Sequence, residues 1–128
     1  MSWPIEDGET GELLALPAAD RAVHFFQLVA DWEEAWGLQD ENGWVVGRDT
    51  DALPLWPHAV FAEACAHGHW EGAVPGPIPL DDLLVDLLPL LAADNLRAAV
   101  FPTPDDPGLI LTATELGERL EQELQIGG

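Results

Sequence analysis

The stretch that decides the fold is Ala35-Trp36-Gly37-Leu38-Gln39-Asp40-Glu41-Asn42-Gly43-Trp44-Val45-Val46. Two short apolar runs flank Asn42-Gly43, and Asn-Gly in such a setting is the strongest short-range signal for a β-hairpin. A hairpin joins antiparallel strands, whereas an all-parallel sheet needs a long crossover between successive strands. The stretch therefore predicts a sheet that is mixed or mainly antiparallel.

An amphipathic helix is predicted before the hairpin. Apolar residues recur at three- and four-residue spacing from Ala22 to Trp32, and Pro17 suits the first turn of such a helix. Residues 1–16 carry acids and glycines without periodicity. We therefore expect a flexible acidic leader over 1–16 and a single domain over 17–126.

The middle of the chain predicts one more strand and one more helix. Residues 53–57 are typical of an extended segment at a sheet edge, because Pro54 lacks the backbone donor that a central strand needs. Pro57 then begins a helix, and Gly68 supplies its left-handed stop. Residues 70–79 are rich in Gly and Pro and predict a connection with extended backbone near Ile78.

The last third predicts a helix, two strands and a final helix. The first helix begins at Pro79, and Pro89 should kink or shorten its last turns. Residues 97–101 and 109–111 are typical of strands joined by a turn. Thr112 and Glu115 have the spacing of a capping box at the start of the final helix. Together these elements predict an α+β fold, with a mixed or mainly antiparallel sheet of about five strands and about four packed helices.

The charge balance is extreme. The 128 residues include 24 Asp and Glu against four Arg and no Lys, for a net charge of −20. Such a field repels nucleic-acid phosphates and anionic lipid surfaces, so we expect neither as a partner, and it attracts a basic protein. The alternative is that the carboxylates only keep the protein soluble or match a salty solvent.

Cysteine usage and the N-terminus bear on location. Cys65 is the only cysteine, cannot form an intramolecular disulfide, and sits in a predicted helix where a buried thiol is expected. The first residues have no basic region or apolar run of signal-peptide length. We expect a cytoplasmic protein.

One cluster contains metal-ligand residue types. Side chains of this kind occur within nine residues at Glu63, Cys65, His67, His69 and Glu71. A metal-binding regulator or metal-dependent enzyme is thus the alternative function. A solvated helix end is the simpler interpretation, because Gly68 separates the two histidines and the apolar neighbours draw Cys65 into the core.

No other constellation indicates catalysis or a cofactor. Ser2 is the only serine, the threonines are not in a nucleophile elbow, and no Gly-rich phosphate loop occurs. We therefore expect a non-enzymatic protein without a cofactor.

Several short motifs resemble, in the same order, a bacterial domain-of-unknown-function family, number 2750. They run between about Ala19 and Leu124 and comprise Glu34-Ala35-Trp36-Gly37-Leu38, Gly43-Trp44, Leu53-Pro54-Leu55-Trp56-Pro57, Trp70-Glu71-Gly72, Ile78-Pro79-Leu80-Asp81-Asp82-Leu83 and Val100-Phe101-Pro102. The resemblance implies a small α+β domain and brings no catalytic residues with it.

These observations favour a protein-binding domain. Its layout is similar to small acidic immunity or effector-binding proteins, so we expect an immunity-type or regulatory inhibitor of a basic partner such as a toxin domain. Tryptophans on one sheet surface, rimmed by acids, would form the binding patch. The predicted partner-binding residues are Trp36, Asp40, Glu41, Trp44, Asp49, Asp51 and Trp56.

Overall fold

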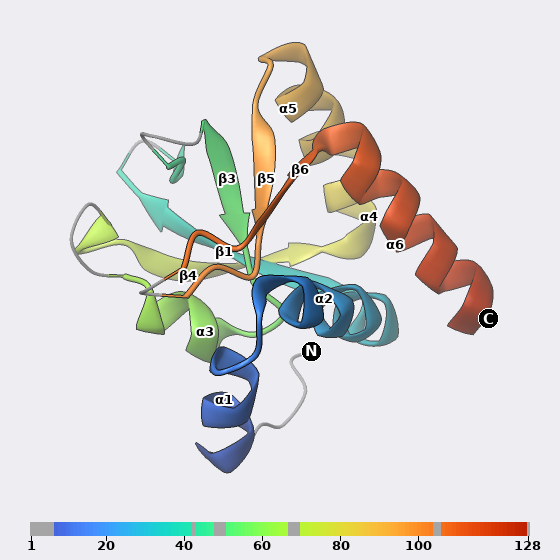
Figure 1. The fold of residues 1–128 in the computed structure, drawn as a ribbon. Coiled ribbons are helices and arrows are strands. Elements are labelled where there is room, and N and C mark those ends of the chain that lie inside the picture. Colours follow the sequence, from blue (N-terminus) through green and yellow to red (C-terminus); the bar gives the residue numbers. More distant parts are fainter. Residues whose placement is uncertain (1–6, 42, 48–50, 67–69, 104–105, 128) are drawn as a thin grey trace.

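A computed structural model describes residues 7–41, 43–47, 51–66, 70–103 and 106–127. In these residues the chain forms two three-stranded sheets and several helices, which confirms the α+β class (Figure 1). The strands divide between two small sheets instead of forming one larger sheet. The strands of the two sheets cross in Figure 1, and the core lies between them and the helices.

The first sheet contains the predicted hairpin. β1 (Glu34–Asp40) lies between β2 (Gly43–Trp44) and β4 (Val74–Pro79), and both pairings are antiparallel. β4 occupies the second half of the predicted connection, so the extended backbone expected near Ile78 is confirmed, and it reaches from Val74 to Pro79 as a full strand. Pro75, Pro77 and Pro79 alternate along β4, and only one side of an edge strand must donate hydrogen bonds. Their missing N–H groups fall on the open side, because Trp36, the partner of Pro77, directs its own N–H and C=O away from β4 to Trp56.

The second sheet has the order β3 (Ala52–Leu55), β5 (Arg97–Val100), β6 (Leu109–Thr112). β3 and β5 are parallel, whereas β5 and β6 are antiparallel, so the predicted mixed pairing is confirmed. Pro54 is on an edge strand, as predicted. Trp36 and Trp56 exchange two backbone hydrogen bonds of 2.8 Å, and this bridge joins the two sheets.

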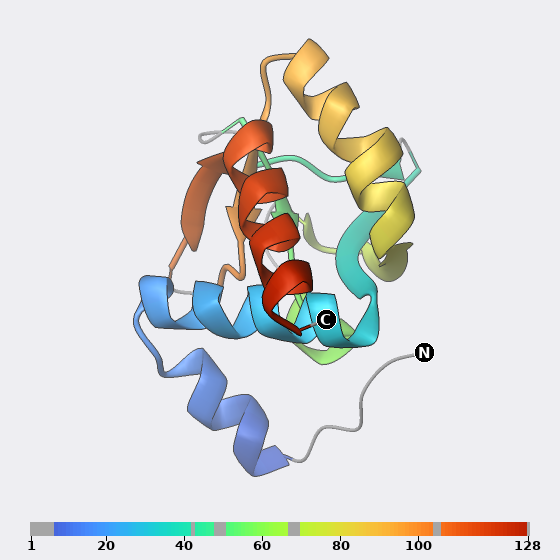
Figure 2. The ribbon, with the colours of Figure 1, turned by 90° about the vertical axis from the view of Figure 1, so that its right-hand side faces the viewer.

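Helices α2 (Ala18–Trp32) and α6 (Ala113–Gly127) bury much of the core. From α2 come Phe25, Phe26 and Val29, all fully buried, and from α6 come Leu116 and Leu120. Figure 2 shows α6 in front of the strands, with α2 crossing below it and the helical segment of α4 and α5 beside it. The capping box is present, since the Thr112 N–H donates to Glu115 and the Glu115 N–H donates to Thr112 Oγ1. The hydrogen bond from the Thr112 N–H, together with the Thr112 side chain, lowers the pKa of the Glu115 carboxyl group.

Pro89 widens its helix instead of ending it. The segment runs from α4 (Leu80–Asp82) through a π-helical turn, η2 (Leu83–Leu87), into α5 (Leu88–Ala93). The Leu88 N–H reaches back five residues to the carbonyl of Leu83. A proline clashes with the carbonyl four residues before it, and the wide turn avoids that clash. The predicted kink is thus replaced by a π turn, and the helix continues to Ala93.

The N-terminal segment is also more ordered than predicted. Residues 7–14 form helix α1 (Asp7–Leu14), and Leu13 and Leu14 pack against the core. Figure 1 shows α1 below α2, and the short helix α3 (Ala59–Ala64) follows β3 in the chain. The sequence of α1 has no apolar periodicity, and Leu13 and Leu14 both lie near its C-terminal end. None of the helices in the described ranges is long and apolar enough to span a bilayer.

Candidate functional site

The predicted partner-binding patch centres on the hairpin. Trp44 pairs with Gln39 across β1 and β2, and its half-buried indole lies over Gly37 and Gly76, which face each other between β1 and β4. A Cβ added at Gly37 would lie 3.0 Å from the Trp44 ring, and one added at Gly76 would lie 3.1 Å from it. The two glycines therefore form a flat platform that holds the Trp44 ring in place.

Acidic side chains are exposed at the hairpin turn and before β3. Asp40 and Glu41 are exposed where β1 ends, and Asp51 is exposed just before β3. Asp51 has a φ of 50° in the left-handed region, and its N–H donates to the carbonyl of Gly47 in the turn after β2. Asp49 lies outside the described residues. We call Asp40, Glu41, Trp44 and Asp51 the hairpin surface.

Trp56 does not belong to any surface. Its side chain is fully buried, and its Nε1–H donates to the carbonyl of Pro102 over 2.8 Å. Its ring also meets Trp70 edge to face at a centroid distance of 6.2 Å. The expectation that Trp56 lies on a partner-binding face is therefore wrong. Trp56 directly follows β3, all of whose residues are buried, and its side chain packs in the same core.

Trp36 is separated from Trp44 by the sheet itself. Because side chains alternate along a strand, Trp36, paired with Pro77, points to the opposite face from Gly37 and Trp44. Trp36 is half-buried, and among the described residues its Nε1 finds no hydrogen-bond partner. The three predicted tryptophans thus do not form one cluster, and of the three only Trp44 lies on the strand that follows the hairpin turn.

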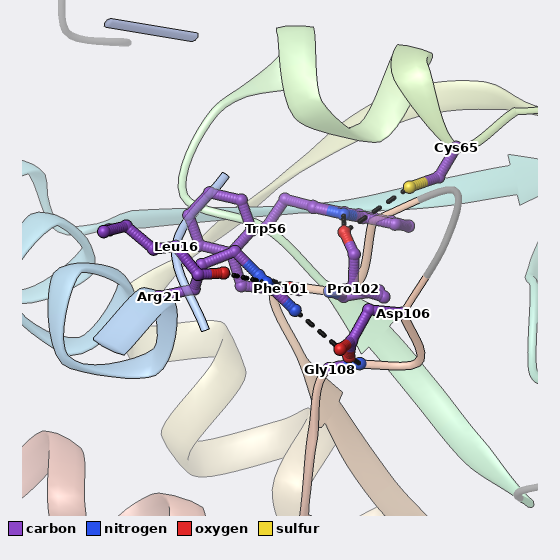
Figure 3. Close-up of polar contacts among 8 residues, drawn as sticks. All are labelled: Leu16, Arg21, Trp56, Cys65, Phe101, Pro102, Asp106 and Gly108. Carbon is purple, nitrogen blue, oxygen red and sulfur yellow. Dashed lines mark hydrogen bonds and ion pairs between the residues drawn. The ribbon is translucent and has the colours of Figure 1, made fainter. Parts of the chain in front are cut away.

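The main polar network of the described chain is centred on Arg21, which sequence reasoning did not select. Arg21 is 2% exposed, and its Nε donates to the carbonyl of Phe101 over 3.0 Å (Figure 3). One terminal nitrogen donates to the carbonyl of Leu16. The other lies 3.1 Å from Asp106 Oδ1, an ion pair that lacks the direction of a hydrogen bond. Arg21 precedes Phe25 by four residues and Val29 by eight, so it lies on the buried face of α2. This spacing could have indicated that Arg21 is a buried residue.

The loop that Arg21 holds is strained and tightly closed. Phe101 has a φ of 54°, unusual for a bulky side chain, and Gly108 has a φ of 82°. A Cβ at Gly108 would lie 2.5 Å from the carbonyl of Val100, so only glycine fits there. The Gly108 N–H donates to Asp106 Oδ1 over 2.7 Å. The same carboxylate oxygen therefore faces both Arg21 and the loop backbone.

Cys65 points into this network. Its Sγ is 3.4 Å from the carbonyl of Pro102, to which the thiol donates, and burial raises the pKa of Cys65 to about 11 (Figure 3). His67 and His69, from the alternative metal prediction, lie outside the described residues. In the ranges that the structure describes, no three His, Cys, Asp or Glu side chains come together as a metal site would require.

A small α+β domain with an acidic, tryptophan-bearing hairpin is the class that this fold and surface define. Residues 22–120 match the family described as "Protein of unknown function (DUF2750)". The chain belongs to the DUF2750 family. Neither a curated protein nor a solved structure matches it.

Proposed function

We propose that this chain is a non-enzymatic protein-binding domain that captures a basic partner through the hairpin surface. In this role it would act as an immunity-type or regulatory inhibitor of a partner such as a toxin domain. The observation that carries the proposal is the placement of Trp44, held on the Gly37–Gly76 platform in the hairpin that also carries the exposed Asp40 and Glu41.

The electrostatic part of the proposal follows from the charge. A net charge of −20 attracts a basic surface over a long range and raises the rate of encounter. Glu41 and Asp51 are exposed at the hairpin surface and would orient the partner there. Exposed pairs of this kind contribute more to association rate and register than to affinity.

Affinity would come from Trp44. A ring that is already immobilised loses little conformational entropy on binding, and tryptophan is enriched among residues that dominate interface energies.

The proposal that the domain is not an enzyme has support from Cys65. The only thiol of the chain is buried, and its raised pKa keeps it protonated at neutral pH, so it is a poor nucleophile.

Affinity capture with the full chain tests the proposal. The double variant Glu41→Gln/Asp51→Asn removes two charges from the hairpin surface, and asparagine tolerates the left-handed backbone of residue 51. The matched control Glu12→Gln/Asp31→Asn removes two exposed charges from α1 and α2. We expect the wild type and the control to retain a basic protein that the hairpin variant releases at lower salt. Equal retention by all three proteins contradicts the proposal.

A further inference from the structure

An open groove lies on another part of the molecule, between the helical segment η2–α5 and the first turns of α6. It has a volume of about 310 Å³. Its walls are apolar or small residues, with two glutamates of α6 on the rim: Leu84, Leu88, Pro89, Ala92, Ala113, Thr114, Gly117, Glu118 and Glu121. The view in Figure 2 faces both helices that form it.

Two features of the sequence create this groove. Gly117 has no side chain on α6, and a Cβ placed there would lie 3.5 Å from Leu88 Cδ1, an ordinary contact. On the other wall, Pro89 directly follows the π turn, which departs from regular α-helix geometry. Turns of this kind often occur at functional sites. On the same segment Val85 is 71% exposed and Leu90 is 57% exposed, so its apolar surface extends beyond the groove.

We propose that this groove binds a basic amphipathic helix of a partner protein, separately from the hairpin surface. The partner's aliphatic side chains would fill the groove over Gly117, and its Lys or Arg side chains would meet Glu118 and Glu121, both exposed. Helix-in-groove recognition has this form, with apolar anchors on one face of the incoming helix.

Charge selects this occupant over others. A second copy of the chain also has a net charge of −20, and the repulsion between like charges opposes its binding at the acidic rim. A small molecule fits less well, because such ligands bury most of their surface and this groove is open to solvent. A cationic helix gains from both the apolar floor and the acidic rim.

The test uses a synthetic, fluorescein-labelled peptide of about 16 residues, with leucines at helical spacing on one face and lysines on the other. A scrambled peptide of the same composition controls for charge alone. Binding to the full chain is followed by fluorescence anisotropy at 150 mM salt. Gly117→Leu fills the groove, Gly117→Ala adds one methyl group, and Glu118→Gln/Glu121→Gln neutralises the rim, with Glu12→Gln/Asp31→Asn as the matched charge control.

We expect one patterned peptide per chain, with affinity lowered roughly tenfold or more by Gly117→Leu and about three- to fivefold by the rim variant. Gly117→Ala and the charge control should bind like the wild type. Gly117→Leu must retain the circular dichroism and cooperative unfolding of the wild type. If it does not, Gly117→Phe or Gly117→Met serves as the filling variant.

Three outcomes would overturn the proposal. They are equal binding of the scrambled peptide, unchanged binding by the folded filling variant, and a dimer in sedimentation that the filling variant dissociates. Because the peptide stands in for the helix and the hairpin residues are untouched, a negative result here leaves the hairpin proposal standing.

Discussion

Arg21 Nε donates a hydrogen bond of 3.0 Å to the carbonyl oxygen of Phe101, a residue 80 positions later in the chain. This contact ties α2 to the strained loop after β5. It also supplies a donor to the backbone carbonyl of a buried residue. The domain therefore places one of its four arginines in the core, although cations are scarce in this chain.

Arg21→Met should strongly destabilise the fold. The substitution keeps an unbranched apolar stem but removes the donors to Phe101 and Leu16. Each orphaned buried group costs about 1–3 kcal/mol, so we expect a loss of roughly 2–5 kcal/mol in the free energy of unfolding. Urea denaturation followed by tryptophan fluorescence measures it.

Two variants separate the buried hydrogen bonds from charge in general. Arg119→Met removes an exposed cation that lies 4.6 Å from the Phe26 ring centroid, and should cost about 1 kcal/mol or less. Asp106→Asn keeps the oxygen that accepts from Gly108 and loses only the ion pair with Arg21, so it should also cost less than about 1 kcal/mol. If Arg21→Met costs no more than these two, the network does not hold the loop.

The titration of Cys65 should make the stability of the domain depend on pH, in a range where few other side chains of this chain titrate. Burial raises its pKa from 9.0 to about 11. Below pH 9 the thiol is protonated in both states and its contribution to stability is fully present. Between pH 9 and 11 only the unfolded chain loses the proton, so stability falls as the pH rises. The chain has no Lys and no Tyr, whose titration would otherwise obscure this range.

Denaturant unfolding at pH 8, 9.5 and 10.5 measures the effect. The wild type should lose stability across the series, and Cys65→Ala should lose much less. The native thiol should also react slowly with iodoacetamide at pH 8 and rapidly once the chain is unfolded. Rapid alkylation of the folded protein would show that Cys65 is accessible.

The sequence predicted the elements with local signals better than those that depend on distant contacts. The Asn-Gly signal, the apolar spacing of α2 and the Thr112–Glu115 capping box each act within a few residues, and the paired hairpin strands, the helix and the capping box that they predict are present. Only the part of β4 near Ile78 was expected, because alternating prolines favour a strand only at an open edge, and nothing local indicates that edge. The π turn before Pro89 was not predicted either. The helix continues through it with Leu83, Leu87 and Leu88 packed in the core, and that packing depends on distant residues.

The candidate surface was predicted only in part. The turn at Asp40 and Glu41 follows from the hairpin, and Trp44 lies beside it. Whether a tryptophan faces solvent depends on strand pairing across the whole chain, which buried Trp56 and placed Trp36 on the opposite face. The Arg21 network depends on residues 80 positions apart and has no comparable local signature.

Added salt should raise the melting temperature. A compact chain with a net charge of −20 repels itself, and screening relieves that repulsion. Differential scanning fluorimetry between 10 and 150 mM NaCl should show an increase, and a smaller one after several exposed acids are neutralised. A melting temperature that stays flat or falls would mean that the carboxylates do not repel one another appreciably in the folded state.

Stopped-flow association with the basic partner recovered by capture tests the central claim most directly. The rate constant for association should fall steeply as salt rises for the wild type and for Glu12→Gln/Asp31→Asn. For Glu41→Gln/Asp51→Asn it should be lower and less dependent on salt. Trp44→Leu, once shown to be folded, should leave association nearly unchanged and speed dissociation. Association that is independent of salt, with both rate constants unaffected by the hairpin variants, would contradict capture through the hairpin surface.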